Sequence, residues 1–323
     1  MSASKLYRLL LVAAAALAMT VVVLGAYVRL SSAGLSCPDW PGCYGQLTVG
    51  AALAHASQID EQFPYRPLEP GKAIKEMVHR YAAGTLGVLI GAAALLAWRN
   101  GRRMVLPLLL ISLVVFQALL GMWTVTLNLK PLVVTAHLIG GMSVLALLWW
   151  SWLETHPRTC VDAHGLRPFA VAGLVLLAMQ IALGGWTSSH YAGLACSGFP
   201  LCNGAWWPHA DFTSGFGEHS LNAAGLVAIQ WAHRLGAAAV ALYLGWLAWR
   251  SRRATAPIRQ AGTALALLLL LQITLGITNV LAHLPLPLAT AHDAVAALLL
   301  LSLVTLIQRL PSATHTARPG EPS

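Results

Sequence analysis

The chain has 323 residues, of which 57% are hydrophobic and 10% are charged. This composition excludes an ordinary soluble domain, in which about a quarter of the residues carry charge. The formal net charge of +9 suits a protein that binds either nucleic acid or a membrane surface, so the positions of the cations must separate these two classes.

Apolar segments long enough to cross a bilayer recur along the whole chain. A transmembrane helix needs about 20 consecutive apolar residues, and inside lipid the backbone hydrogen bonds must be satisfied internally. We therefore predict an all-α polytopic membrane protein, with a retained first span rather than a cleaved signal peptide. The eight predicted spans cover residues 7–29, 76–98, 104–127, 131–153, 168–188, 228–249, 260–282 and 287–308.

Basic residues gather on one side of these spans. Lys5 and Arg8 precede the first span, whereas the segment 189–227 contains neither Lys nor Arg. Because cationic residues stay on the cytoplasmic side of a membrane, we expect both termini in the cytoplasm and no nucleic-acid partner. The arginines that follow the even-numbered spans are Arg99, Arg102, Arg103, Arg158, Arg167, Arg250, Arg252, Arg253, Arg259, Arg309 and Arg318.

The first predicted outer loop contains two cysteines that flank the sequence "PDWPG". Pro and Gly favour a tight reversal of the chain, which would bring Cys37 and Cys43 within bonding range. Disulfides persist outside the cytoplasm, so we predict a bridge between these two residues. A structural bridge is the commoner use of such a pair, and thiol–disulfide exchange is the alternative.

The second predicted span begins with Glu76, His79 and Arg80. A three-residue step places Glu76 on the same helix face as His79, one turn nearer the outside. A carboxylate beside a ligand site can relay a proton or stabilise a developing cation. The alternative is a charge that is favoured by the positive end of the helix dipole. A second imidazole, His137, follows in the fourth span.

The chain then repeats its own pattern. The sequence "VHRYAAGTLGVL" (78–89) matches "AHRLGAAAVAL" (232–242), and "FQALLGMWTVTLNLKPLVVTAH" (116–137) matches "LQITLGITNVLAHLPLPLATAH" (271–292). With four predicted spans on each side, both halves have the same orientation in the membrane. Such a parallel repeat argues against a transporter built from inverted halves.

We therefore predict two parallel-repeat four-helix bundles, residues 1–155 and residues 156–323. The second half has its own cysteine pair, Cys196 and Cys202, around the sequence "SGFPL" in a predicted outer loop, and we expect a second bridge there. Gln230 stands where the first half has Glu76. This difference predicts a catalytic N-terminal half and a permanently bound cofactor in the C-terminal half.

Histidines at matched positions identify the cofactor. His233 and His292 occupy the positions of His79 and His137. A lone histidine in a membrane helix often bonds only to a neighbouring helix, but two in each bundle indicate function. Facing imidazoles in a bundle core suit the two axial positions of haem iron. Zinc or copper is the weaker alternative, because neither half offers an obvious third or fourth ligand at that depth.

Arg80 and Arg234 each follow the first histidine of a pair. An arginine at the membrane boundary can pair with a haem propionate. The alternative is that the side chain only extends towards water. Asp293 follows His292, and Cys160 lies in a predicted cytoplasmic loop; the sequence assigns neither of them a role.

Taken together, these motifs resemble the haem A synthase family, in its cysteine-containing bacterial branch. The resemblance covers the chain from the first span to the last, and it rests on "EMVHR", on "TAH" twice and on two C-x5-C loops. It implies an oxidoreductase that converts haem O into haem A for cytochrome oxidase. The C8 methyl group of haem O becomes a formyl group, by way of an alcohol and a gem-diol.

The resemblance also assigns the site residues. His79 and His137 would bind the iron of the substrate haem, Glu76 would be the catalytic carboxylate, and His233 with His292 would hold a b-type haem. The branch has bridges that match Cys37–Cys43 and Cys196–Cys202. It further implies the inner membrane of a bacterium and haem O that is delivered by a haem O synthase. The positions of the four histidines near the outer ends of their spans predict haem sites towards the outer face.

Two other functions compete with this interpretation. A di-haem membrane cytochrome that is linked to quinol explains the four histidines but not Glu76 opposite Gln230. A membrane thiol oxidoreductase explains the cysteines but not the histidines. The sequence names neither the electron carrier nor the oligomeric state, and a homo-oligomer remains open.

Overall fold

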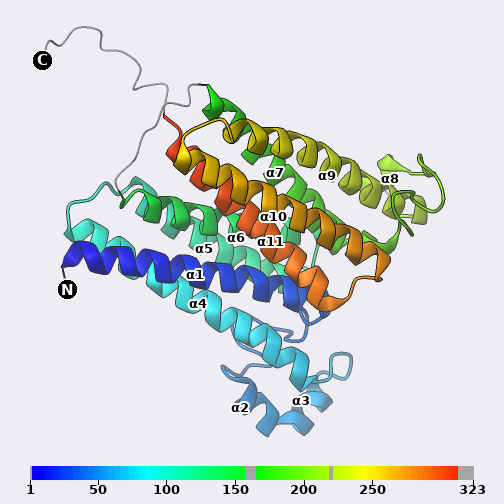
Figure 1. The fold of residues 1–323 in the computed structure, drawn as a ribbon. Helices are drawn as coiled ribbons and strands as arrows, with labels where there is room; N and C mark the ends of the chain where they lie inside the picture. The colour runs from blue at the N-terminus through cyan, green and yellow to red at the C-terminus, as the bar shows by residue number, and fades with distance from the viewer. Residues whose placement is uncertain (1, 157–164, 218–220, 312–323) are drawn as a thin grey trace, which may run out of the picture.

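The structure, a computed structural model, describes residues 2–156, 165–217 and 221–311 (Figure 1). These residues form helices and no β-sheet, and eight of the helices are long and apolar enough to cross a membrane. The predicted all-α polytopic membrane protein is confirmed. The eight are α1 (Ala3–Leu30), α4 (Pro70–Arg99), α5 (Val105–Thr126), α6 (Pro131–Leu153), α7 (Leu166–Ser189), α9 (Ala223–Ser251), α10 (Ala256–Leu281) and α11 (Leu286–Arg309).

Two of these helices begin well before the predicted spans. Helix α4 starts at Pro70, where a proline is well tolerated because the first turn needs no N–H donor. Helix α9 starts after Asn222, whose side chain accepts a 2.7 Å hydrogen bond from the Gly225 N–H and so caps the helix. The first turn of α4 contains no acidic residue. The alternative that Glu76 is a charge at the very start of its helix is therefore wrong.

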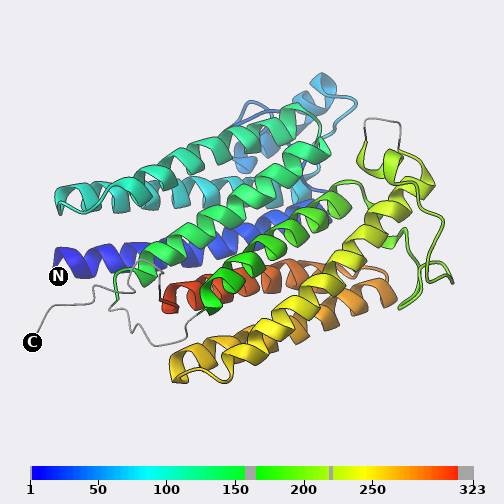
Figure 2. The ribbon, with the colours of Figure 1, turned by 90° about the horizontal axis from the view of Figure 1, so that it is seen from above.

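The long helices run side by side (Figures 1 and 2), and the start of α1 lies at the same end of the bundle as the end of α11. Three short helices lie at the opposite end: α2 (Val49–Ala54), α3 (Ala56–Gln62) and α8 (Phe212–Phe216). They belong to the two long loops that carry the cysteine pairs.

Packing joins the two predicted halves into one bundle. Helix α1 packs against α4 and α6, and α7 packs against α9 and α11; α1, α6, α7 and α11 also pack across the division. One hydrophobic core includes Leu11 and Leu145 from the first half and Leu244 and Leu303 from the second. The helices thus share a core, and the division into two repeated halves stays a prediction.

The outward surface of the bundle is apolar. Val88 on α4 is 72% exposed and Leu242 on α9 is 78% exposed. Large apolar side chains turned outward over long helices are expected of a surface that faces lipid. Together with the length and hydropathy of the helices, they mark the chain as a multi-pass membrane protein.

Candidate functional site

The four matched histidines lie on four different long helices. His79 is on α4 and His137 on α6, and these two imidazoles are close enough to interact electrostatically. His233 on α9 and His292 on α11 interact in the same way. The structure therefore brings together the histidine pairs that the sequence predicted.

Several of these imidazoles have a buried nitrogen without a partner. The Nδ1 atoms of His79, His137 and His292 are shielded from solvent and make no hydrogen bond. Unsatisfied buried polar atoms are rare, and each calls for a missing partner such as an ion or a ligand. Among the described residues, no group of three or more His, Cys, Asp or Glu side chains could hold a metal ion. Pairs of imidazoles fit haem iron, which needs two axial ligands, better than zinc, which takes about four.

Glu76 lies at the centre of a charged network on α4. This residue is only 4% exposed. One oxygen, Oε2, accepts the N–H groups of Ser36 at 2.9 Å and Cys37 at 3.0 Å, and the other, Oε1, accepts Nη2 of Arg80 at 2.5 Å. Gln230, at the matched position, is equally buried, but its Oε1 has no partner. The two halves therefore differ in charge and in hydrogen bonding at this point.

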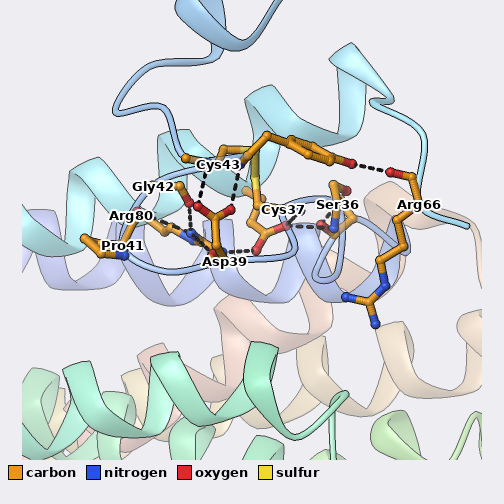
Figure 3. The surroundings of a disulfide bond; sticks show 12 residues. Ser36, Cys37, Asp39, Pro41, Gly42, Cys43, Arg66 and Arg80 are labelled. Atoms are coloured by element: carbon orange, nitrogen blue, oxygen red, sulfur yellow. Dashed lines mark hydrogen bonds and ion pairs between the residues drawn. A yellow bond between two sulfur atoms is a disulfide. The ribbon is translucent and has the colours of Figure 1, made fainter. Parts of the chain in front are cut away.

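Arg80 of α4 forms hydrogen bonds with the first disulfide loop. The predicted bridge between Cys37 and Cys43 is present. Figure 3 shows Arg80 reaching into this loop, where its Nη1 donates to the carbonyl oxygens of Asp39 at 2.9 Å and Gly42 at 2.5 Å, with Pro41 at 3.3 Å. These bonds connect the loop to the helix that carries His79.

The second disulfide loop is held in a similar way. The predicted bridge between Cys196 and Cys202 is present. Arg234 donates from Nη2 to the carbonyl oxygen of Cys196 at 2.8 Å and from Nη1 to that of Leu201 at 3.2 Å. Both arginines thus bind loop carbonyls. Their contact with haem propionates stays a prediction, and it would use the donors that these bonds leave.

Residues 8–304 match the family model described as COX15-CtaA, cytochrome oxidase assembly protein. The chain belongs to this family. The match runs from the first long helix into the last, so it covers both histidine pairs and both disulfide loops of this family member.

Relatives named heme A synthase are similar to this family member over most of its length. The protein of Shewanella oneidensis is 44% identical over 303 residues, which cover 89% of this chain and 92% of the relative. The protein of Rhizorhabdus wittichii is 30% identical over 319 residues, 90% of each chain. The protein of Parvibaculum lavamentivorans is 30% identical over 312 residues, 88% of each. The predicted resemblance to the haem A synthase family is confirmed.

Sequence reasoning missed the glutamines that lie beside the histidines. Gln180 Nε2 lies 3.0 Å from both Nδ1 and the backbone oxygen of His233. Gln272 Nε2 lies 3.2 Å from Nε2 of His292. An amide inside an apolar span is the same signal that singled out the histidines, because polar groups are costly in lipid. The imidazoles of His233 and His292 are therefore each contacted by a glutamine amide.

The sequence left Asp293 and Cys160 without a role, and the second long loop adds two tryptophans. Asp293 follows His292 on α11. Cys160 lies outside the described residues. Trp206 and Trp207 are 71% and 72% exposed in the second long loop. Exposed tryptophans at this end of the bundle suit the membrane–water interface.

Proposed function

We propose that the chain is a haem A synthase that oxidises the C8 methyl group of haem O to a formyl group, giving haem A for cytochrome oxidase. The observation that carries this proposal is the asymmetry between two otherwise similar sites. Both have a partly buried histidine pair, but three residues before the first histidine of the pair the first site has a carboxylate, Glu76, and the second has the amide of Gln230.

In this proposal, His79 and His137 bind the iron of the substrate haem O, and His233 and His292 hold a resident haem b. The proximity of the two imidazoles in each pair supports this assignment. So do the unsatisfied Nδ1 atoms of His79, His137 and His292. A haem b with two histidine ligands would supply one-electron transfer at the second site. Since haem O has a long farnesyl tail, its site belongs next to lipid.

We propose that Glu76 stabilises positive charge that develops near the reacting methyl group. Both carboxylate oxygens are already engaged, by the N–H groups of Ser36 and Cys37 and by Arg80. Proton uptake would remove the charge that pairs with Arg80, whereas electrostatic stabilisation keeps this ion pair intact. Preorganised charges of this kind are effective in sites that exclude water.

The orientation in the membrane is part of the proposal. Lys5 and Arg8 near the start of α1, and Arg309 at the end of α11, support a cytoplasmic position for this end of the bundle in a bacterial cell. The disulfide loops and both haem sites then face the outer side of the inner membrane. A haem O synthase would deliver the substrate through the lipid, and a separate electron carrier would accept the electrons.

The deciding experiment supplies the purified full chain with haem O and an artificial electron acceptor in aerated buffer, so that the four electrons removed from the methyl group have an acceptor. The extracted haems are then separated by chromatography. The wild type is expected to produce a formyl haem. Glu76→Gln keeps an oxygen that can accept the loop N–H groups, and we expect it to retain haem b but to lose at least about 100-fold in conversion. Gln230→Ala changes the matched position of the other half and should convert haem O normally.

Two results would contradict this proposal. Full conversion by Glu76→Gln would refute the role of the carboxylate. A wild type that binds haem but yields no formyl haem from haem O would favour the di-haem cytochrome. The thiol oxidoreductase is disfavoured because all four paired cysteines are 0% exposed, and exchange requires access to a sulfur atom.

A further inference from the structure

Each matched histidine lies against a glycine of a neighbouring long helix. His79 on α4 faces Gly25 on α1, and His233 on α9 faces Gly184 on α7. His137 on α6 and His292 on α11 face glycines on α5 and α10, which are Gly121 and Gly276. The same relation therefore recurs at every predicted haem ligand.

The space beside each imidazole is too small, or barely large enough, for a methyl group. A Cβ atom built on Gly25 would lie 3.0 Å from Cε1 of His79, and one on Gly276 would lie 3.1 Å from Cε1 of His292. For Gly184 and His233 the distance is 3.3 Å, and for Gly121 and His137 it is 3.5 Å. Below 3.4 Å the neighbour must move by a few tenths of an ångström, whereas 3.5 Å is an ordinary contact.

The atom that a methyl group would meet is informative. In all four cases the nearest atom is Cε1, the ring carbon between the two imidazole nitrogens. A push on this carbon moves both nitrogens, and with them the atom that would bind iron. Two glycines on the histidine-bearing helices have free space instead, because a Cβ on Gly91 of α4 or on Gly245 of α9 would meet nothing within 4 Å.

We propose that Gly25, Gly184 and Gly276 are positioning residues, which set the place of their imidazoles by leaving room beside them, whereas Gly121 leaves room for a methyl group. This inference rests on the proposed haem sites. It gives the glycines a role that helix packing alone does not require, since each contact is made with the ligand side chain. The graded distances predict a graded effect: Ala is most disruptive at Gly25 and Gly276, weaker at Gly184 and tolerated at Gly121.

The test measures bound haem rather than turnover. Wild type, Gly276→Ala and Gly184→Ala are purified as full chains, and haem per protein is measured with the optical and electron paramagnetic resonance spectra of the low-spin haem. We expect Gly276→Ala to retain haem about 10- to 100-fold more weakly, the usual cost of disturbing the outer contacts of a metal ligand. Gly184→Ala should show a smaller loss of bound haem and a shift of the low-spin signal in the electron paramagnetic resonance spectrum.

The control is Gly245→Ala, which adds the same methyl group to open space on α9. Its haem content and spectrum should equal those of the wild type, and the thermal unfolding midpoints of all variants show whether they fold. If Gly276→Ala does not fold, the more loosely packed Gly184→Ala carries the test.

For the first site, the same preparations are titrated with haem O. Gly25→Ala should bind it more weakly than Gly121→Ala, with Gly91→Ala as the control. If the wild type binds haem and the Gly276 and Gly184 variants match it in haem content and spectrum, the role of the glycines is refuted while the proposed function stands. A wild type that is recovered without haem from haem-replete cells would refute the proposed function itself, and the role of the glycines with it.

Discussion

At the scale of the residue, the two halves use arginine in the same way and the carboxylate differently. Arg80 and Arg234 both donate to carbonyl oxygens of a disulfide loop, but only Arg80 also binds a carboxylate. The side chains of Glu76 and Arg80 are 5% and 12% exposed, so solvent screens their ion pair little. Hydrogen bonds with a charged partner contribute about 1.5–3 kcal/mol each. Arg80 is therefore a main support of the first loop.

Replacement of Arg80 by Ala should expose the first disulfide and leave the second protected. The loop carbonyls lose their donors, and Glu76 becomes a buried charge without its cation, a change that typically costs about 3–5 kcal/mol. The measurement is the rate at which each bridge is reduced and alkylated, followed by mass spectrometry of peptides that contain Cys43 or Cys202.

Arg234→Ala is the matched control. It should increase the rate of reduction only for the bridge between Cys196 and Cys202. Equal labelling of both bridges in either variant would mean that the arginines stabilise the bundle as a whole rather than their own loops.

At the scale of the element, the first outer segment forms a small hydrophobic core of its own against the start of α4. Its buried members include both loop cysteines, Tyr44, Ile59 of α3 and Met77 of α4. The ring of Tyr44 packs edge-on against Phe63 at 5.3 Å, and its hydroxyl group donates to the backbone oxygen of Arg66 at 2.8 Å. Burial raises the pKa of Tyr44 above its ordinary value of 10.0. The phenol therefore stays protonated and remains a donor.

This raised pKa predicts that the folded outer segment becomes less stable at alkaline pH. Because the folded loop favours the protonated phenol, its stabilising contribution is complete below pH 10.0 and is lost as the pH rises through the higher pKa of the folded state. Limited proteolysis of the segment between Tyr44 and Leu68, at increasing pH, measures the effect.

Tyr44→Phe lacks the titrating group and should lose this alkaline step. At neutral pH it should be less stable than the wild type by about 1 kcal/mol, the usual contribution of a hydrogen bond. An alkaline step of unchanged size in Tyr44→Phe would assign the titration to another group.

Hydropathy predicted the helices because lipid imposes a simple rule on composition, and cysteine spacing predicted both bridges because a short loop leaves few alternatives. The contacts of Arg80 were beyond prediction, since its partners are backbone carbonyls that have no signature in the sequence. The early start of α4 was missed for a related reason: hydropathy marks the part of a helix inside lipid, not its end. The glycine beside each histidine depends on how neighbouring helices are rotated, which no single span reveals.

At the scale of the whole molecule, the bundle is joined across the predicted division by polar as well as apolar contacts. Arg29 on α1 donates a 2.6 Å hydrogen bond to the backbone oxygen of Ser188 on α7. The indole of Trp149 on α6 donates to the hydroxyl group of Thr305 on α11 at 2.9 Å. Together with the continuous core, these contacts predict that the two sites unfold as one unit.

A double-mutant cycle tests this connection between α6 and α11. Trp149→Phe and Thr305→Val each remove one partner of the hydrogen bond, so the double variant should be more stable than the sum of the single effects predicts. Interhelical hydrogen bonds in membranes couple by about 0.6 kcal/mol on average and by up to about 1.7 kcal/mol. Thermal unfolding in detergent provides the four stabilities.

Trp150→Phe is a control for the same cycle, because its indole donates to Glu154, the residue that follows α6, at 3.0 Å. Its effect should add to that of Thr305→Val without coupling. Additive effects for Trp149 and Thr305 as well would show that this contact does not join the halves.

The carboxylate of Glu76 accepts hydrogen bonds from the backbone of the first loop, at the N–H groups of Ser36 and Cys37. Every amino acid except proline offers that N–H. The side chains at these two positions can therefore change without removing either hydrogen bond, as long as the backbone keeps its conformation. The attachment of this loop to Glu76 depends on the backbone conformation at Ser36 and Cys37, not on the identity of their side chains.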